Sequence, residues 1–136
     1  GTTIRAVMDV LGLKNTLLGV DAVLNRKLVG SDLNESALLE LLDEMDSKGI
    51  PAKVVVTVIG GQGYVFGRGN QQLSHRVLKR VGKDNIIIAA TEAKMIALGG
   101  KPLLVDTGDI TVNEQLSGYV KVITSMNRQM AYRVAY

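Results

Sequence analysis

The stretch Val54–Gln72, VVVTVIGGQGYVFGRGNQQ, joins a run of β-branched residues to a segment that has five glycines between residues 60 and 69. An unbroken aliphatic run is typical of a central strand that is buried on both faces of a sheet. Strand and helix patterns then alternate from residue 52 to residue 105. This alternation predicts an α/β fold whose mixed, mainly parallel sheet has helical crossovers.

Cap and stop signals on both sides of this stretch set the other expected elements. Asn34, Ser74 and Thr91 each precede a run with helical spacing, and glycine or proline ends these runs. Alternating residues near the two chain ends predict antiparallel hairpins, within a single domain of residues 1–136. The expected helices are 4–11, 34–48, 74–82 and 91–98, and the expected strands are 16–24, 28–29, 54–59, 86–90, 103–105, 119–124 and 130–134.

Composition excludes several classes of site. The chain has no cysteine and one histidine, so disulfides and thiolate metal sites are excluded and no metal site is predicted. No apolar run approaches the roughly 20 residues of a membrane helix, and we expect a cytoplasmic protein without membrane contact. The net charge is only +3. Since the basic residues form no stripe with aromatics, we expect no nucleic-acid partner.

The glycine-rich segment is the first candidate for a binding site. Glycines allow positive φ and let a ligand approach the main chain, where free N–H groups can surround phosphate oxygens. Arg68 would supply a fixed forked charge, and Asn70 and Gln71 could bond a ribose or a base edge. The alternative is a structural hairpin in which residues 64–66 form a strand between two tight turns. The candidate binding residues are Gly60, Gly61, Gln62, Gly63, Gly67, Arg68, Gly69, Asn70 and Gln71.

A second candidate follows the strand at 103–105. Asp106, Thr107 and Asp109 could hold Mg²⁺ or supply a base toward a substrate hydroxyl. The alternative is a structural turn in which Asp109 caps the next segment, and this alternative is favoured. His75 is interpreted as a solvated residue in the first turn of a helix. The acidic helix at 35–46 and the basic helix that follows Ser74 are interpreted as solvated surface.

Several of these runs resemble the C-terminal part of the ATP-NAD kinase family, in the branch that includes the acetoin-catabolism X proteins. They are IGGQGYVFGRGNQQLSHRVLKRVGKDNIIIAAT at 59–91, KPLLVDTGD at 101–109, GYVKVIT at 118–124 and NTLLGVDAV at 15–23. The resemblance covers nearly the whole chain, and the one departure noted is His75 where the family has proline. It implies a largely β domain, whereas the residue pattern predicts alternating α/β, and we follow the pattern.

The resemblance also implies phosphorylation of a nucleotide hydroxyl, such as the 2′-OH of NAD, with ATP or polyphosphate as donor. The family's catalytic Asp lies in a Gly-Gly-Asp-Gly motif of an N-terminal domain. That motif does not occur in these 136 residues, so no catalytic residue is assigned. We therefore expect a nucleotide-binding C-terminal domain that is inactive alone. Its ligand would be ATP or NAD(P), and Mg²⁺ is a candidate ion bound with that ligand. Its partners would be the N-terminal domain and further copies of the chain. The alternatives are a regulatory module that senses a nucleotide or coenzyme, and a structural assembly domain.

Overall fold

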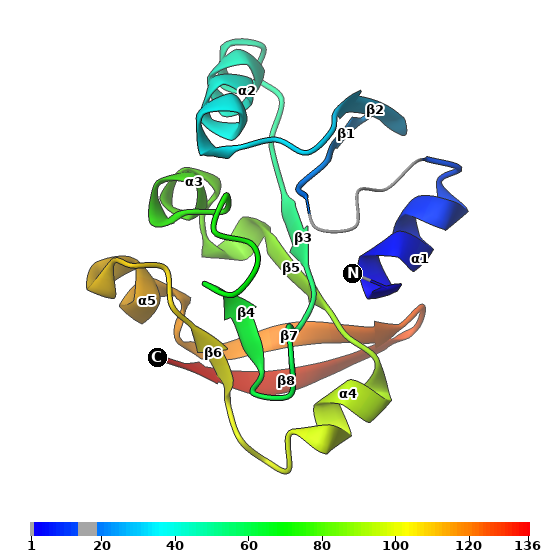
Figure 1. Cartoon of the computed structure of the whole chain (residues 1–136), viewed down its shortest axis with the longest axis vertical. Helices are drawn as coiled ribbons and strands as arrows, with labels where there is room; N and C mark the ends of the chain where they lie inside the picture. Colours follow the sequence, from blue (N-terminus) through cyan, green and yellow to red (C-terminus); the bar gives the residue numbers. More distant parts are fainter. Residues whose placement is uncertain (1, 14–18) are drawn as a thin grey trace.

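The computed structural model describes residues 2–13 and 19–136 (Figure 1). Its secondary structure follows the predicted order, with the helix at 110–116 as an element that was not predicted, and three helices begin at predicted caps. Asn34, Ser74 and Thr91 each accept a hydrogen bond from the backbone N–H three residues later. The elements are α1 (Thr2–Val10), β1 (Ala22–Leu24), β2 (Lys27–Gly30), α2 (Glu35–Ser47), β3 (Val54–Val56), β4 (Tyr64–Phe66), α3 (His75–Val81), a 3₁₀ turn (Lys83–Asn85), β5 (Ile86–Ala89), α4 (Glu92–Ala97), β6 (Leu103–Val105), α5 (Ile110–Leu116), β7 (Gly118–Ser125) and β8 (Arg128–Ala135).

Six strands form one mixed sheet in the order β3-β5-β7-β8-β6-β4. Four of its strand pairs are parallel, and only β7 and β8 pair antiparallel. The sheet therefore consists of two parallel halves that run in opposite directions and meet at the β7–β8 hairpin. The remaining two strands, β1 and β2, form a separate antiparallel hairpin. The predicted α/β class, with a mainly parallel sheet and hairpins toward both chain ends, is confirmed.

The sheet is rolled, because its two edge strands are consecutive in the sequence. Ile59, three residues after β3, forms an isolated antiparallel bridge with Tyr64, the first residue of β4. Three residues and one bridge span at most ~16 Å. Six strands in a flat sheet would instead hold their edges ~24 Å apart. The end of β3 is thus brought toward the start of β4, and Val58 between them is fully buried.

One prediction about the sheet is wrong. The run 54–59 was expected to be a central strand, but β3 ends at Val56 and lies at an edge, where Val55 is half-exposed. The C-terminal hairpin takes the central place instead, although its strands alternate in burial. The β-branched run at 54–59 is partly buried because the rolled sheet brings other segments over it, and not only because strands lie beside it. Periodicity does not distinguish these two environments.

The helices pack around the sheet on several sides. Figure 1 shows α2, α3 and α5 one beneath another along one side of the molecule, and α1 with the β1–β2 hairpin on the other side. One hydrophobic core joins the strands to α3, α4 and α5, and its fully buried side chains include Phe66, Leu78 and Leu103. No helix in the described residues is long and apolar enough to cross a membrane.

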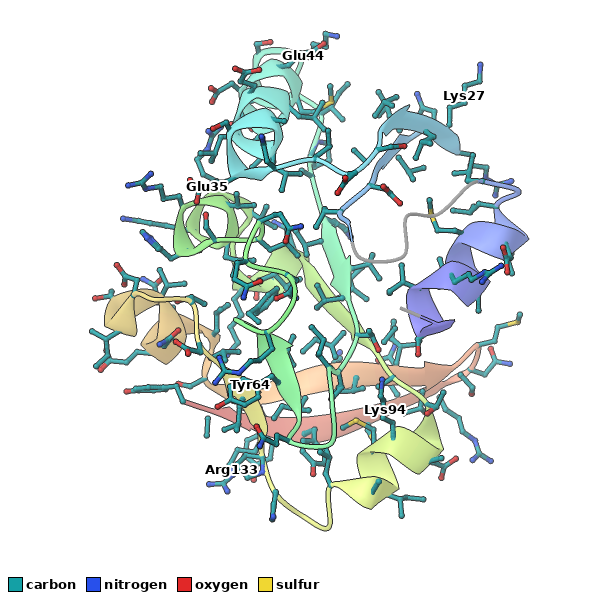
Figure 2. The ribbon with its side chains drawn as sticks, viewed as in Figure 1. Lys27, Glu35, Glu44, Tyr64, Lys94 and Arg133 are labelled. Atoms are coloured by element: carbon teal, nitrogen blue, oxygen red, sulfur yellow. The ribbon has the colours of Figure 1, made fainter. Side chains whose placement is uncertain are left out.

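Ion pairs join the acidic helix α2 to the basic helix α3, although both faces were interpreted as solvated surface. Arg80 donates to Asp43 at 2.6 Å and to Asp46 at 2.7 Å. Hydrogen bonds to Asp46 and Asp43 raise the pKa of the Arg80 guanidinium above its ordinary value. Glu35, at the end of α2 nearest α3 in Figure 2, is 3.6 Å from Arg76. The two charged faces are therefore complementary, and they fix α2 against α3.

Candidate functional site

Two loops come together where β4 and β6 end. Because these strands are parallel neighbours, their carboxyl ends lie at the same edge of the sheet. The loop Gly67–Asn70 follows β4, and the loop Asp106–Asp109 follows β6. The Asp106 N–H donates to the Phe66 carbonyl at 3.1 Å, which holds the start of one loop against the end of the neighbouring strand. The two separate candidate segments of the sequence thus lie side by side, and we refer to them together as the strand-end site.

Gly67 is required at this junction. Its φ is +95°, and a Cβ at this position would collide with the carbonyl oxygen of Asp106. Only glycine combines this backbone conformation with so close an approach of a second chain segment. The side chain of Asn70 then closes the loop, since its Oδ1 accepts from the Gly67 N–H at 3.2 Å and its Nδ2 donates to the Val65 carbonyl at 2.8 Å. Both polar atoms of the Asn70 amide are therefore engaged within the loop, so Asn70 shapes the loop, and its predicted contact with a ribose or base stays a prediction.

Arg68 lies over an aromatic ring at the rim of the strand-end site. Its Cζ is 4.2 Å from the centroid of the Tyr64 ring, within the range of a cation–π contact. Its NH1 donates to the Gly67 carbonyl at 3.1 Å and approaches Asp106 Oδ2 at 3.4 Å. The side chain is 50% exposed. Arg68 is thus oriented by contacts on one face and one edge, while the rest of the guanidinium is accessible.

The loop after β6 is held by Asn113, a residue that was not predicted as part of the site. Asn113 Oδ1 accepts from the Thr107 N–H at 3.0 Å and from the Thr107 hydroxyl at 2.6 Å. Asp109 caps α5 by accepting from the Val112 N–H at 3.0 Å. The structural role favoured for Asp109 in the sequence is confirmed, and Thr107 is likewise engaged within the loop. Asp106 is the loop's exposed carboxylate.

His75, the first residue of α3, extends the site toward that helix. Its Nδ1 lies 4.0 Å from Asp109 Oδ2, and both side chains are a little over one-third exposed. This distance is too long for a hydrogen bond, so the pair is a proximity of polar groups. The approach of Asp109 adds a neighbour that was not foreseen for this first-turn residue.

The remaining glycines lie at the other end of β4. Residues 60–63 form the tight turn that the Ile59–Tyr64 bridge closes, and Gly63 is buried against Leu98 and the Pro102 carbonyl. A strand of three residues separates this turn from Gly67, a distance of about 10 Å. The predicted segment 60–71 therefore divides into a hairpin turn and a strand-end loop. Some of the predicted residues lie at the carboxyl end of β4, the end at which the loop after β6 also lies. They are Gly67, Arg68, Gly69, Asn70 and Gln71 from the first loop, and Asp106, Thr107 and Asp109 from the second.

Tyr64 and Asn113 are the residues of the site that the sequence did not indicate. Asn113 lies four residues after the cap Asp109, one turn into a helix that begins at Ile110. Recognition of that helix from its cap would have placed the Asn113 side chain beside the loop. Tyr64 meets Arg68 only because the loop after β4 turns back, and no local signal predicts that contact.

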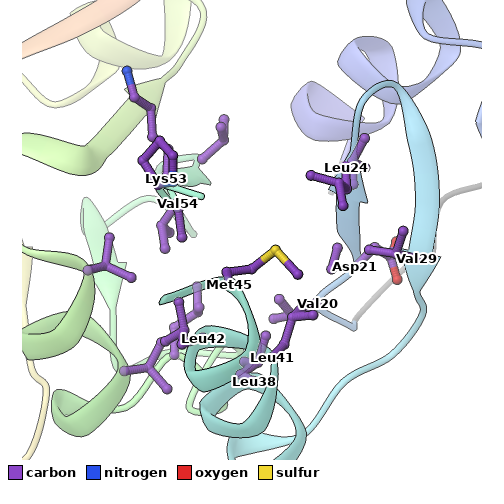
Figure 3. A pocket seen from close by; sticks show the side chains of 18 of the residues that line it. Val20, Asp21, Leu24, Val29, Leu38, Leu41, Leu42, Met45, Lys53 and Val54 are labelled. Carbon is purple, nitrogen blue, oxygen red and sulfur yellow. The ribbon is translucent and has the colours of Figure 1, made fainter. Parts of the chain in front are cut away.

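A second concave feature lies away from these loops. A cavity of about 350 Å³ opens between α1, the β1–β2 hairpin, α2 and β3 (Figure 3). Its lining is aliphatic except for Asp21 and Lys53, and Figure 3 shows the Lys53 amine directed away from the aliphatic side chains. None of the predicted site residues lines it. Phosphate groups require polar partners, so this cavity does not suit a nucleotide's charged end.

The strand-end site contains positively and negatively charged hydrogen-bonding groups, but its side chains do not form a set of metal ligands. Within residues 2–13 and 19–136, no group of three or more His, Cys, Asp or Glu side chains is placed to hold a metal ion. Two carboxylates suit Mg²⁺ when a bound phosphate completes the coordination. Asp106 and Asp109 are the carboxylates of the strand-end site, and by themselves they do not complete the octahedral coordination of Mg²⁺.

Comparison with known proteins gives one match. The family model of the ATP-NAD kinase C-terminal domain matches residues 3–134, nearly the whole chain. No curated protein and no solved structure matches the chain.

Proposed function

Because the chain belongs to the family of ATP-NAD kinase C-terminal domains, we propose that its strand-end site binds a nucleotide, ATP or NAD(P), for a kinase-like phosphotransferase. The observation that supports this proposal most is the junction of the two loops. Gly67, Arg68 and Asp106 come from segments 38 residues apart and are held together at the carboxyl ends of two parallel strands. Ligands of open α/β sheets bind at that end of the strands.

The binding groups differ in part from those expected. Arg68 and Asp106 present charge at the surface of the site, and the exposed backbone of Gly69 lies beside them. Asn70 and Thr107 hold the two loops in shape through internal hydrogen bonds. A site whose loops are already fixed loses little conformational entropy when a ligand binds. The turn at 60–63 stays a prediction as a phosphate site, and it lies outside the strand-end site.

Phosphoryl transfer by this site requires a second domain. Catalysis of this kind depends on the positioning of a nucleophile and on stabilisation of charge at the transferred group. We assign no catalytic residue within the chain, and we propose that an N-terminal domain with the Gly-Gly-Asp-Gly motif supplies it, in the cytoplasm and within a homo-oligomer. The alternative, a module that senses a nucleotide or coenzyme without catalysis, uses the same binding site. Kinase activity of the two-domain protein distinguishes the two proposals.

A thermal-shift screen tests the binding proposal. The chain would be heated with ATP, ADP, NAD, NADP, coenzyme A or polyphosphate, with and without Mg²⁺. Binding to the native state raises Tm, by an amount that follows RT ln(1 + [L]/Kd). We expect a selective rise that Arg68→Ala abolishes. Arg76→Ala, a change of another exposed arginine that lies on α3, is the control and should keep the rise. A rise that both variants keep would contradict the proposed site.

A further inference from the structure

The strand-end site contains more negative than positive charge. Among the described residues, Arg68 is its one fixed cation, whereas Asp106 and Asp109 each contribute a carboxylate, 55% and 39% exposed. Arg68 NH1 is already 3.4 Å from Asp106 Oδ2. A chain of phosphates entering between these groups would meet two like charges, and the cation would be partly neutralised by its own neighbour. The charge balance therefore disfavours a bare polyphosphate.

The groups that stay accessible suit a hydroxyl and a flat ring. In the part of the chain that the structure describes, Asp106 Oδ1 has no hydrogen-bond partner, so it can accept from a ribose hydroxyl. Tyr64 covers one face of the Arg68 guanidinium, and NH1 is held in place by the Gly67 carbonyl. The Arg68 side chain is 50% exposed, and the Tyr64 contact accounts for one face only. Guanidinium planes stack on nucleobases, and a plane that is already fixed by neighbours loses little freedom in doing so.

We infer that the strand-end site holds the nucleoside part of the ligand: a base stacked on the face of Arg68 opposite Tyr64, with Asp106 accepting a hydrogen bond from the ribose diol. This inference rests on the proposed function and deepens it, since it separates the nucleoside from the phosphates of the same nucleotide. Carboxylates bind ribose hydroxyls in other nucleotide sites for the same reason, namely that they are acceptors without competing donors. The phosphates would then extend out of this charge cluster.

Calorimetric titration of the 136-residue chain with three probes tests the inference. The probes are adenosine, 2′,3′-dideoxyadenosine and inorganic tripolyphosphate, with ATP and NAD titrated in parallel. We expect adenosine to bind, dideoxyadenosine to bind at least fivefold more weakly, and tripolyphosphate to give no heat of binding. In Asp106→Asn the difference between the two nucleosides should shrink to less than twofold. This comparison of two ligands on one variant is independent of any effect of the substitution on folding.

A second substitution separates stacking from charge. Arg68→Lys keeps the positive charge but removes the flat guanidinium, so adenosine affinity should fall about tenfold, to the level of Arg68→Ala. If tripolyphosphate binds, adenosine does not, and Asp106→Asn strengthens tripolyphosphate binding, the nucleoside assignment is overturned while the nucleotide site stands. If ATP and NAD also fail to bind, the proposed function itself fails.

Discussion

Gly67→Ala is the substitution whose cost follows most directly from the structure. The φ of +95° lies in the region that favours glycine, and an L-residue there costs about 1–2 kcal/mol. The new Cβ would also collide with the Asp106 carbonyl oxygen, so the two loops must separate. Separation breaks the hydrogen bond from the Asp106 N–H to the Phe66 carbonyl, worth about 1 kcal/mol. We therefore expect a loss of about 2–3 kcal/mol in the free energy of unfolding.

Urea denaturation measures this loss, and two other glycines serve as controls. Gly69 has a φ of +75° but nothing within 4 Å of an added Cβ, so Gly69→Ala should show only the backbone cost of about 1–2 kcal/mol. Gly61 has neither feature, and Gly61→Ala should leave stability within about 0.5 kcal/mol of the parent. For a chain of this length, the Gly67→Ala loss corresponds to a fall in Tm of about 7–10 °C. Equal stabilities of the Gly67→Ala and Gly69→Ala proteins would refute the close approach of the two loops.

Three further substitutions test local interactions. Asn70→Ala should lower the free energy of unfolding by about 1–3 kcal/mol in urea, because the Val65 carbonyl and the Gly67 N–H lose their partner; no loss would mean that water or another group replaces the amide. Arg26→Gly should raise the free energy of unfolding by about 0.5–1 kcal/mol, since Arg26 holds a φ of +63° in the β1–β2 turn. An unchanged urea midpoint would contradict this backbone strain. Arg80→Ala should lower Tm at low salt by removing both contacts to α2, and 1 M NaCl should reduce the difference; a difference that salt does not alter would argue for lost packing.

Helix caps and stop residues in the sequence predicted the bounds of most helices. The caps Asn34, Ser74 and Thr91 lie where expected, and each of the four predicted helices ends within about two residues of its predicted stop, whereas α5 was not predicted as a helix. A side-chain oxygen that satisfies a free N–H is a local interaction, so it can be recognised without knowledge of the fold. The predicted strand at 16–24 is described only in part, since residues 14–18 lie outside the described residues, and β1 covers its end.

The order of the strands could not be predicted from the same patterns. The run 54–59 has the composition of a central strand, yet β3 lies at one edge and β4 at the other, with the sheet rolled between them. Strand order depends on contacts between distant segments, and the aliphatic composition of β3 does not encode which strand lies beside it. The same limit applies to the site. Asp106 and Gly67 were found separately as residues that follow strands, but their contact depends on the pairing of β4 with β6.

A titration of the ¹⁵N-labelled chain with NAD or ATP, followed by backbone amide chemical shifts, tests whether a nucleotide binds where β4 and β6 end. We predict that the largest changes fall on Gly67, Gly69 and Asn70 and on residues 107–108, with little change at residues 60–63. Changes concentrated at residues 60–63, or along the aliphatic cavity between α1, α2 and β3, would contradict this proposal and move the ligand to another part of the domain.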